Sequence, residues 1–147
     1  MRATDLFHVG IVADDFEATL SQLTATLGYE WCPEMGACIP VHLSSGVEML
    51  DLRFVYSRSE PRLEIVRRVP GSLWEPAAGS GIHHLGYWSD DLERDASALE
   101  STGMTREAVG KDEGGALKWS YHRGTTGPRI EMISTAVRPF MEKYWVS

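Results

Sequence analysis

The sequence predicts an α+β fold made of two tandem βαβββ modules. Three observations carry this prediction. The chain has 147 residues, about the length of one domain. Residues 7–17 align with residues 83–93, and residues 61–66 align with residues 128–133. Because the two alignments follow the same order along the chain, we expect two copies of one unit within a single domain that covers residues 1–147.

The first module is expected over residues 5–70. Its β-branched content predicts a strand at residues 6–12. A helix follows, with Asp14 or Asp15 as its N-cap, apolar residues at helical spacing and Gly28 as its stop. Shorter strands are expected at residues 38–44, 47–56 and 61–68. The order of elements is therefore β-α-β-β-β.

The second module, over residues 82–135, repeats this plan. A strand is predicted at residues 82–88, and the next helix has Asp90 or Asp91 as its N-cap and Gly103 as its stop. The remaining strands are expected at residues 104–109, 116–123 and 129–134.

A linker and a C-terminal tail complete the organisation. Residues 71–81 are rich in Pro, Gly, Ser and Ala, which is typical of a connection between modules. Residues 136–147 form a tail that is too apolar to be left in water. Its apolar side chains are Phe140, Met141, Tyr144 and Trp145. We expect the tail to pack on the core or on a neighbouring subunit, and the second alternative fits a possible homodimer.

The charge balance excludes several classes of partner. Lys and Arg number 14 against 21 Asp and Glu, which gives a net charge of −7. No basic cluster is longer than Arg67-Arg68, so neither nucleic acid nor an anionic membrane is an expected partner. Residues 1–5 lead into the first strand without the apolar segment of a signal peptide, and no apolar run approaches the length of a membrane span. A cytoplasmic location is expected.

Each module places a His two residues before a Gly on its first strand. Since side chains alternate along a strand, His8 shares a face with Gly10, and His84 shares a face with Gly86. The missing side chain of each glycine leaves room for a bound group beside the imidazole. His83 faces the opposite way and is expected to be a packing residue.

Each module also places a Glu on its last strand, at Glu64 and Glu131. Burying a carboxylate without a partner is expensive. If a pseudo-twofold axis relates the modules, both carboxylates can converge with His8 and His84 on one divalent cation. Two imidazoles and two carboxylates suit Zn, Ni, Co, Mn or Fe(II) and do not favour Ca.

Arg62 and Arg129 precede the two Glu residues by two positions and are expected on the same faces. They can hold a substrate carboxylate in bidentate fashion. Alternatively, they pair with Glu64 and Glu131, and the histidines are ordinary core residues. Candidates for lining an apolar substrate cavity are Trp31, Trp88, Trp119 and Tyr121, for which a simple core role is also open.

These patterns resemble the vicinal oxygen chelate superfamily, which includes glyoxalase I, methylmalonyl-CoA epimerase, extradiol dioxygenases and bleomycin-resistance proteins. The resemblance rests on the paired His-x-Gly strands with Asp-Asp at the helix start and on the paired Arg-aliphatic-Glu strands, and it covers residues 5–134. It implies that the modules form an open mixed-sheet barrel around a divalent metal. The implied ligands are His8, Glu64, His84 and Glu131.

Two segments, residues 81–86 and 122–131, most resemble the epimerase and its glyoxalase-like relatives. This makes His122 a candidate substrate-binding residue. Residues 122–124 depart from the epimerase pattern, which usually has His-Pro-Lys there.

The resemblance implies a metal-dependent enzyme that removes a proton next to a metal-bound carbonyl of a small organic substrate, as an isomerase, epimerase or lyase. Glu64 or Glu131 is expected to act as the base. One alternative is a small-molecule-binding or drug-sequestering protein that uses the same cavity. A non-haem iron dioxygenase is less favoured, because four protein ligands leave fewer open positions than a triad of two His and one carboxylate.

Overall fold

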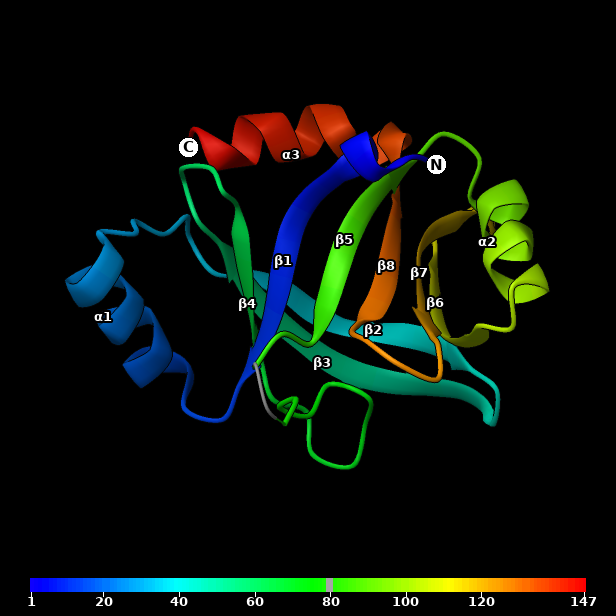
Figure 1. Ribbon diagram of the computed structural model, residues 1–147, viewed down its shortest axis with the longest axis horizontal. Helices are drawn as coiled ribbons and strands as arrows, with labels where there is room; N and C mark the ends of the chain where they lie inside the picture. The colour runs from blue at the N-terminus through cyan, green and yellow to red at the C-terminus, as the bar shows by residue number, and fades with distance from the viewer. Residues whose placement is uncertain (79–80) are drawn as a thin grey trace.

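The computed structural model describes residues 1–78 and 81–147, and it shows a strongly curved sheet with helices on its outside (Figure 1). The first module consists of β1 (Leu6–Ala13), α1 (Phe16–Leu27), β2 (Met35–Leu43), β3 (Gly46–Tyr56) and β4 (Leu63–Arg67). The second consists of β5 (His84–Ser89), α2 (Leu92–Ser101), β6 (Thr105–Lys111), β7 (Leu117–Arg123) and β8 (Arg129–Ser134). The predicted α+β class and the two βαβββ modules are confirmed.

The eight strands form one closed barrel in the order β1-β4-β3-β2-β6-β7-β8-β5. Within the modules, β1 runs parallel to β4 and β5 runs parallel to β8, whereas β1 and β5 join the modules antiparallel. The sequence predicted an open barrel. The sheet closes because the end of β2 reaches β6, where His42 pairs with Val109 and Leu43 with Ala108. This seam is short.

The helix boundaries follow from their caps. Asp15 accepts a hydrogen bond from the backbone N–H of Ala18 at 3.0 Å, and Asp91 accepts one from the N–H of Arg94 at 3.1 Å. Asp15 and Asp91 are therefore the N-caps among the predicted alternatives. Gly28 ends α1 in the left-handed conformation with φ 74°, as predicted for a C-terminal glycine.

The predicted linker contributes to the interior of the barrel. Residues 79 and 80 of the linker lie outside the described part of the chain. Trp74 is 2% exposed and packs with Val12, Val41 and Tyr121 in the core cluster of the barrel. The linker is therefore more than a connection, because it supplies one wall of the barrel interior.

The C-terminal tail forms a short 3₁₀ turn, Thr135–Val137, and the helix α3 (Arg138–Trp145). This helix lies across one end of the barrel (Figure 1). Met141 is buried with Tyr56 and Trp88, so the tail packs on the core of its own chain. None of the helices in the described ranges combines the length and apolar character needed to cross a bilayer.

Candidate functional site

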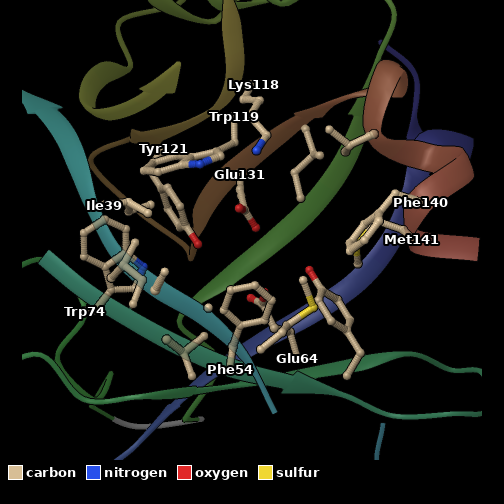
Figure 2. A pocket seen from close by; sticks show the side chains of 18 residues that line it. Ile39, Phe54, Glu64, Trp74, Lys118, Trp119, Tyr121, Glu131, Phe140 and Met141 are labelled. Carbon is tan, nitrogen blue, oxygen red and sulfur yellow. The ribbon is translucent and has the colours of Figure 1, made fainter. Parts of the chain in front are cut away.

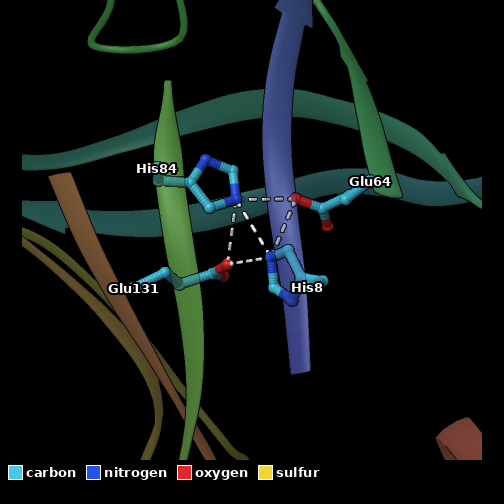
Figure 3. Close-up of side chains that lie close together, drawn as sticks. All are labelled: His8, Glu64, His84 and Glu131. Atoms are coloured by element: carbon cyan, nitrogen blue, oxygen red, sulfur yellow. Dashed lines mark hydrogen bonds and ion pairs between the residues drawn. The ribbon is translucent and has the colours of Figure 1, made fainter. Parts of the chain in front are cut away.

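Four side chains from neighbouring strands meet inside the barrel (Figure 3). They are His8 on β1, Glu64 on β4, His84 on β5 and Glu131 on β8. One ligand atom from each lies within 4.8 Å of the others, and all four residues are buried. The structure thus brings together the four residues that the sequence predicted as metal ligands.

The two glycines of the first strands allow the imidazoles to meet. His8 pairs with Gly86 across the β1–β5 ladder, and Gly10 pairs with His84. A Cβ atom at Gly10 would lie 2.0 Å from Cε1 of His84, and a Cβ atom at Gly86 would lie 2.0 Å from Cε1 of His8. The space expected to hold a bound group is therefore filled by the imidazole of the other module.

The donor atoms of the cluster face one common centre. Nε2 of His84 lies 2.9 Å from Oε2 of Glu64 and 3.2 Å from Oε2 of Glu131. Nε2 of His8 lies 3.1 Å from the same Glu131 oxygen and 3.1 Å from Nε2 of His84. This Glu131 oxygen has no well-formed hydrogen bond despite the short distances. Ligands arranged around a small cation have this geometry.

Charges in the cluster stabilise one another. Burial by itself raises the pKa of Glu131, but the interactions with His8 and His84 lower it below its ordinary value. Burial likewise acts to lower the pKa of His84, but the contacts with Glu131 and Glu64 outweigh it and raise the pKa to about 9. Glu131 therefore carries a negative charge at neutral pH, and the protonated imidazole of His84 faces it at 3.2 Å.

A tyrosine accompanies each carboxylate. Tyr56 on β3 is the cross-strand partner of Glu64, and Tyr121 on β7 is the cross-strand partner of Glu131. Burial, together with the nearby carboxylates, raises the pKa of both phenols, so they stay protonated. Sequence reasoning missed Tyr56. Extending the repeat to align residues 54–57 with residues 119–122 would have found it.

His83 orients the His84 ring through a hydrogen bond to Nδ1, the ring nitrogen that does not face the cluster. Nε2 of His83 lies 2.7 Å from the carbonyl oxygen of Leu73, which can only accept, so this nitrogen carries the proton. A guanidinium nitrogen of Arg129 is farther away, at 3.5 Å. Nδ1 of His83 then accepts a hydrogen bond from Nδ1–H of His84 at 3.0 Å. His84 consequently presents Nε2 to the cluster, and His83 does more than the packing that was predicted for it.

A cavity of about 290 Å³ adjoins the cluster and is lined by both Glu64 and Glu131 (Figure 2). Trp119 and Tyr121 line it, as expected. Trp31 and Trp88 do not: Trp31 packs with the core cluster under α1, and Trp88 stacks on Phe7. Lining residues that the sequence reasoning missed include Phe54, Trp74, Lys118 and Phe140.

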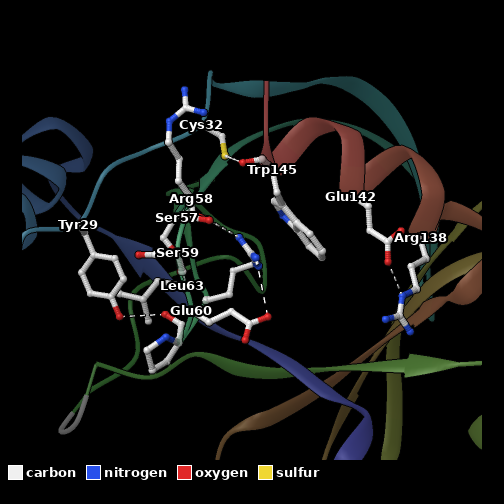
Figure 4. Close-up of polar contacts among 12 residues, drawn as sticks. Tyr29, Cys32, Ser57, Arg58, Ser59, Glu60, Leu63, Arg138, Glu142 and Trp145 are labelled. Carbon is white, nitrogen blue, oxygen red and sulfur yellow. Dashed lines mark hydrogen bonds and ion pairs between the residues drawn. The ribbon is translucent and has the colours of Figure 1, made fainter.

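The two arginines expected to bind substrate lie outside this cavity. Arg62 donates to the carbonyl oxygen of Ser57 at 2.6 Å and lies 4.0 Å from the ring centre of Trp145, in the region shown in Figure 4. It precedes the first residue of β4, so strand alternation does not fix its direction. Arg129 forms an ion pair with Glu107 at 2.6 Å.

His122 also lies away from the cavity. It follows Tyr121 on β7 and therefore faces the opposite side of the sheet, toward α2. It is fully buried, and its Nε2 is 3.8 Å from Oε1 of Glu100. Burial lowers its pKa, with a further contribution from Arg106.

Comparisons with known proteins agree with this architecture. The model of a family described as the Glyoxalase/Bleomycin resistance protein/Dioxygenase superfamily matches residues 7–122. No protein with a curated description matches the chain.

Several solved structures share the fold at low sequence identity. Methylmalonyl-CoA epimerase from Mycobacterium tuberculosis is 18% identical, with a TM-score of 0.60 over 91% of this chain and 92% of that one. The Streptomyces coelicolor epimerase in complex with 2-nitronate-propionyl-CoA is 16% identical, with a TM-score of 0.59 over 88% and 96%. A hypothetical protein from Bacillus halodurans is 16% identical, with a TM-score of 0.56 over 88% and 92%.

Proposed function

Because the chain belongs to the glyoxalase, bleomycin resistance protein and dioxygenase superfamily, we propose that it is a metal-dependent enzyme of the glyoxalase and epimerase type. It removes a proton next to the carbonyl of a small organic substrate, as an isomerase, epimerase or lyase. The observation that carries this proposal is the convergence of His8, Glu64, His84 and Glu131 beside an apolar cavity.

The residues of the cluster fit a divalent cation. Two buried carboxylates need compensating positive charge. A protonated His84 supplies one such charge, and the described part of the chain places no Lys or Arg within the cluster to supply the other. Two imidazole nitrogens and two carboxylate oxygens suit Zn, Ni, Co, Mn or Fe(II). When bound there, such a cation would polarise a substrate carbonyl and acidify the neighbouring C–H bond.

Glu64 and Glu131 are the candidate bases. Both reach the cavity wall, each beside a protonated tyrosine that can donate a hydrogen bond to it. The two carboxylates come from different modules, so one can take a proton and the other can return one, as epimerisation requires. The apolar wall keeps water away from the deprotonated carbon.

Metal analysis tests the ligand assignment. Protein purified without chelator is expected to contain one divalent ion per chain, and His84→Ala is expected to lose it. A protein without stoichiometric metal, whose ligand binding is unaffected by His84→Ala, would instead be a small-molecule-binding protein.

Solvent-deuterium exchange tests the reaction. Metal-loaded protein is expected to exchange the proton next to the carbonyl of its substrate, with α-keto thioesters, hemithioacetals and 2-substituted acyl-CoAs as a first screen. Glu64→Gln and Glu131→Gln show which carboxylate is the base, because the base variant loses exchange more completely. Glu113→Gln, in an exposed loop, is the matched control.

A further inference from the structure

Aromatic side chains make up much of the cavity wall. They are Phe54, Tyr56, Trp74, Trp119, Tyr121 and Phe140. Trp74, Trp119 and Tyr121 contact one another edge to face, with ring centres 5.3, 5.7 and 6.1 Å apart. A ring-bearing ligand can continue this packing, because aromatic rings prefer edge-to-face and offset contacts.

The size of the cavity limits the ligand. Its volume of about 290 Å³ is close to the lower limit for small-molecule pockets, about 300 Å³. The helix α3 covers part of it through Phe140 and Met141, and Val137 of the preceding 3₁₀ turn also lines it. A compact molecule fits this space, whereas a long carrier would have to lie outside it.

The charges around the cavity limit the ligand further. Glu64 and Glu131 are engaged with the imidazoles, and Lys118 is the one cationic residue among the described residues that line the cavity. No ion pair or hydrogen bond joins the Lys118 ammonium to another side chain in the described part of the chain. Figure 2 shows its amine turned toward the cavity from β7. The wall can therefore neutralise one anionic group, and further buried charges would lack partners.

We propose that the substrate is a compact ring-bearing ketone with one anionic substituent, and not a thioester of a long phosphorylated carrier. Its carbonyl faces the cation site formed by the cluster of His8, Glu64, His84 and Glu131. Its ring packs against Trp74 and Trp119, and its anionic group pairs with Lys118. This assignment rests on the function proposed above, since it uses the same site.

Four probes separate these features. 4-Acetylbenzoate has the ring, the carbonyl and the anion; acetophenone lacks the anion; levulinate lacks the ring; and propionyl-CoA carries the long phosphorylated carrier. Calorimetry on Zn(II)-loaded protein is expected to show 4-acetylbenzoate binding about tenfold more tightly than levulinate, because the ring buries more apolar area. Propionyl-CoA is expected to bind more weakly than 4-acetylbenzoate. Equal or tighter binding of levulinate or propionyl-CoA overturns the substrate class.

Lys118→Met tests the anion contact, and Lys111→Met is the matched control on the adjacent strand, outside this cavity. Lys118→Met is expected to lower the affinity for 4-acetylbenzoate by about threefold to fivefold, since a partly exposed ion pair contributes modestly to binding. Acetophenone binding is expected to be unchanged in both variants. If Lys118→Met leaves 4-acetylbenzoate affinity unchanged, the role of Lys118 is wrong.

Titrations on metal-free protein distinguish this proposal from the proposed function. A protein that takes up none of Zn(II), Ni(II), Co(II), Mn(II) and Fe(II) but still prefers 4-acetylbenzoate to levulinate refutes the metal-dependent reaction and supports the ligand class. A protein that binds Zn(II) and prefers propionyl-CoA to 4-acetylbenzoate refutes the ligand class and leaves the metal-dependent reaction supported.

Discussion

The two modules supply the same ligands but support them differently. In the second module, His84 donates from Nδ1 to His83, which in turn donates to the carbonyl oxygen of Leu73. In the first module, Nδ1 of His8 has no hydrogen-bond partner among the described residues. The residue before His8 is Phe7, at the position that His83 occupies in the second module. One imidazole is thus held by hydrogen bonds and the other by packing.

Packing in the first module comes from aromatic rings. Phe7 meets the His8 ring edge to face at 4.5 Å and stacks on Trp88 at 3.9 Å. Tyr56 also contacts the His8 ring edge to face, with ring centres 5.3 Å apart. These contacts fix the plane of the ring, but they do not decide which nitrogen carries the proton. A sequence repeat can therefore conserve ligand geometry while the control of protonation differs between its copies.

The largest effects are expected from replacing Gly10 and Gly86, the glycines that occupy equivalent positions in the two modules. Gly10→Ala and Gly86→Ala each force a methyl group into an imidazole of the other module, since the contacts would be only 2.0 Å. Each variant is expected to lose about 2–3 kcal/mol in the free energy of unfolding and to lose stoichiometric metal. Thermal denaturation and metal analysis measure the two effects.

Gly124→Ala is the control for these variants. Its Cβ atom would meet only ordinary contacts, the nearest at 3.6 Å from the backbone oxygen of Thr126. Gly124→Ala is expected to keep both stability and metal. If Gly10→Ala were tolerated equally well, the close approach of the imidazoles across the β1–β5 ladder would be contradicted.

A smaller effect is expected when the second module is made to resemble the first. His83→Phe removes the acceptor for Nδ1–H of His84, so His84 no longer has a fixed tautomer. The affinity for Co(II), followed by its visible absorption, is expected to fall about 10- to 100-fold. His83→Gln keeps an amide oxygen that can accept the same hydrogen bond, so it is expected to recover much of the affinity.

The matched variant in the first module is Phe7→Leu. It is expected to lower stability through lost aromatic packing while leaving Co(II) affinity close to that of the wild type. Equal losses of affinity in His83→Phe and Phe7→Leu would show that both positions act through packing alone.

Strand alternation and the repeat made the cluster predictable from sequence. Alternation gave the face of Glu64 and Glu131, and the equivalence of the modules brought the four ligands to one point. The same rule failed for Arg62, because alternation does not extend beyond a strand end. Trp74 could not be predicted as a lining residue, since a Pro- and Gly-rich linker has no periodicity. The role of His83 depends on a carbonyl in that linker, at Leu73, which no local pattern reveals.

The smallest expected effect concerns another pair of equivalent positions, Ser57 and His122, which follow the two cavity tyrosines. Burial, and then Arg106, lowers the pKa of His122, so the folded protein favours the neutral imidazole. The unfolded chain therefore binds more protons below about pH 6.5, the ordinary value for His. The stability that depends on neutral His122 is fully present above that pH and is lost as the pH falls through the lowered pKa of the folded state.

His122→Ser, which copies the first module, removes this contribution. The difference in unfolding free energy between wild type and His122→Ser, measured by urea denaturation, is expected to shift in favour of the variant as the pH falls from 7.5 to 5. All other side chains are the same in both proteins, so their contributions cancel in the difference. A difference that does not change with pH would mean that His122 takes up its proton in the folded protein as readily as in the unfolded chain. The second module would then be no more sensitive to acid at this position than the first, whose serine does not titrate.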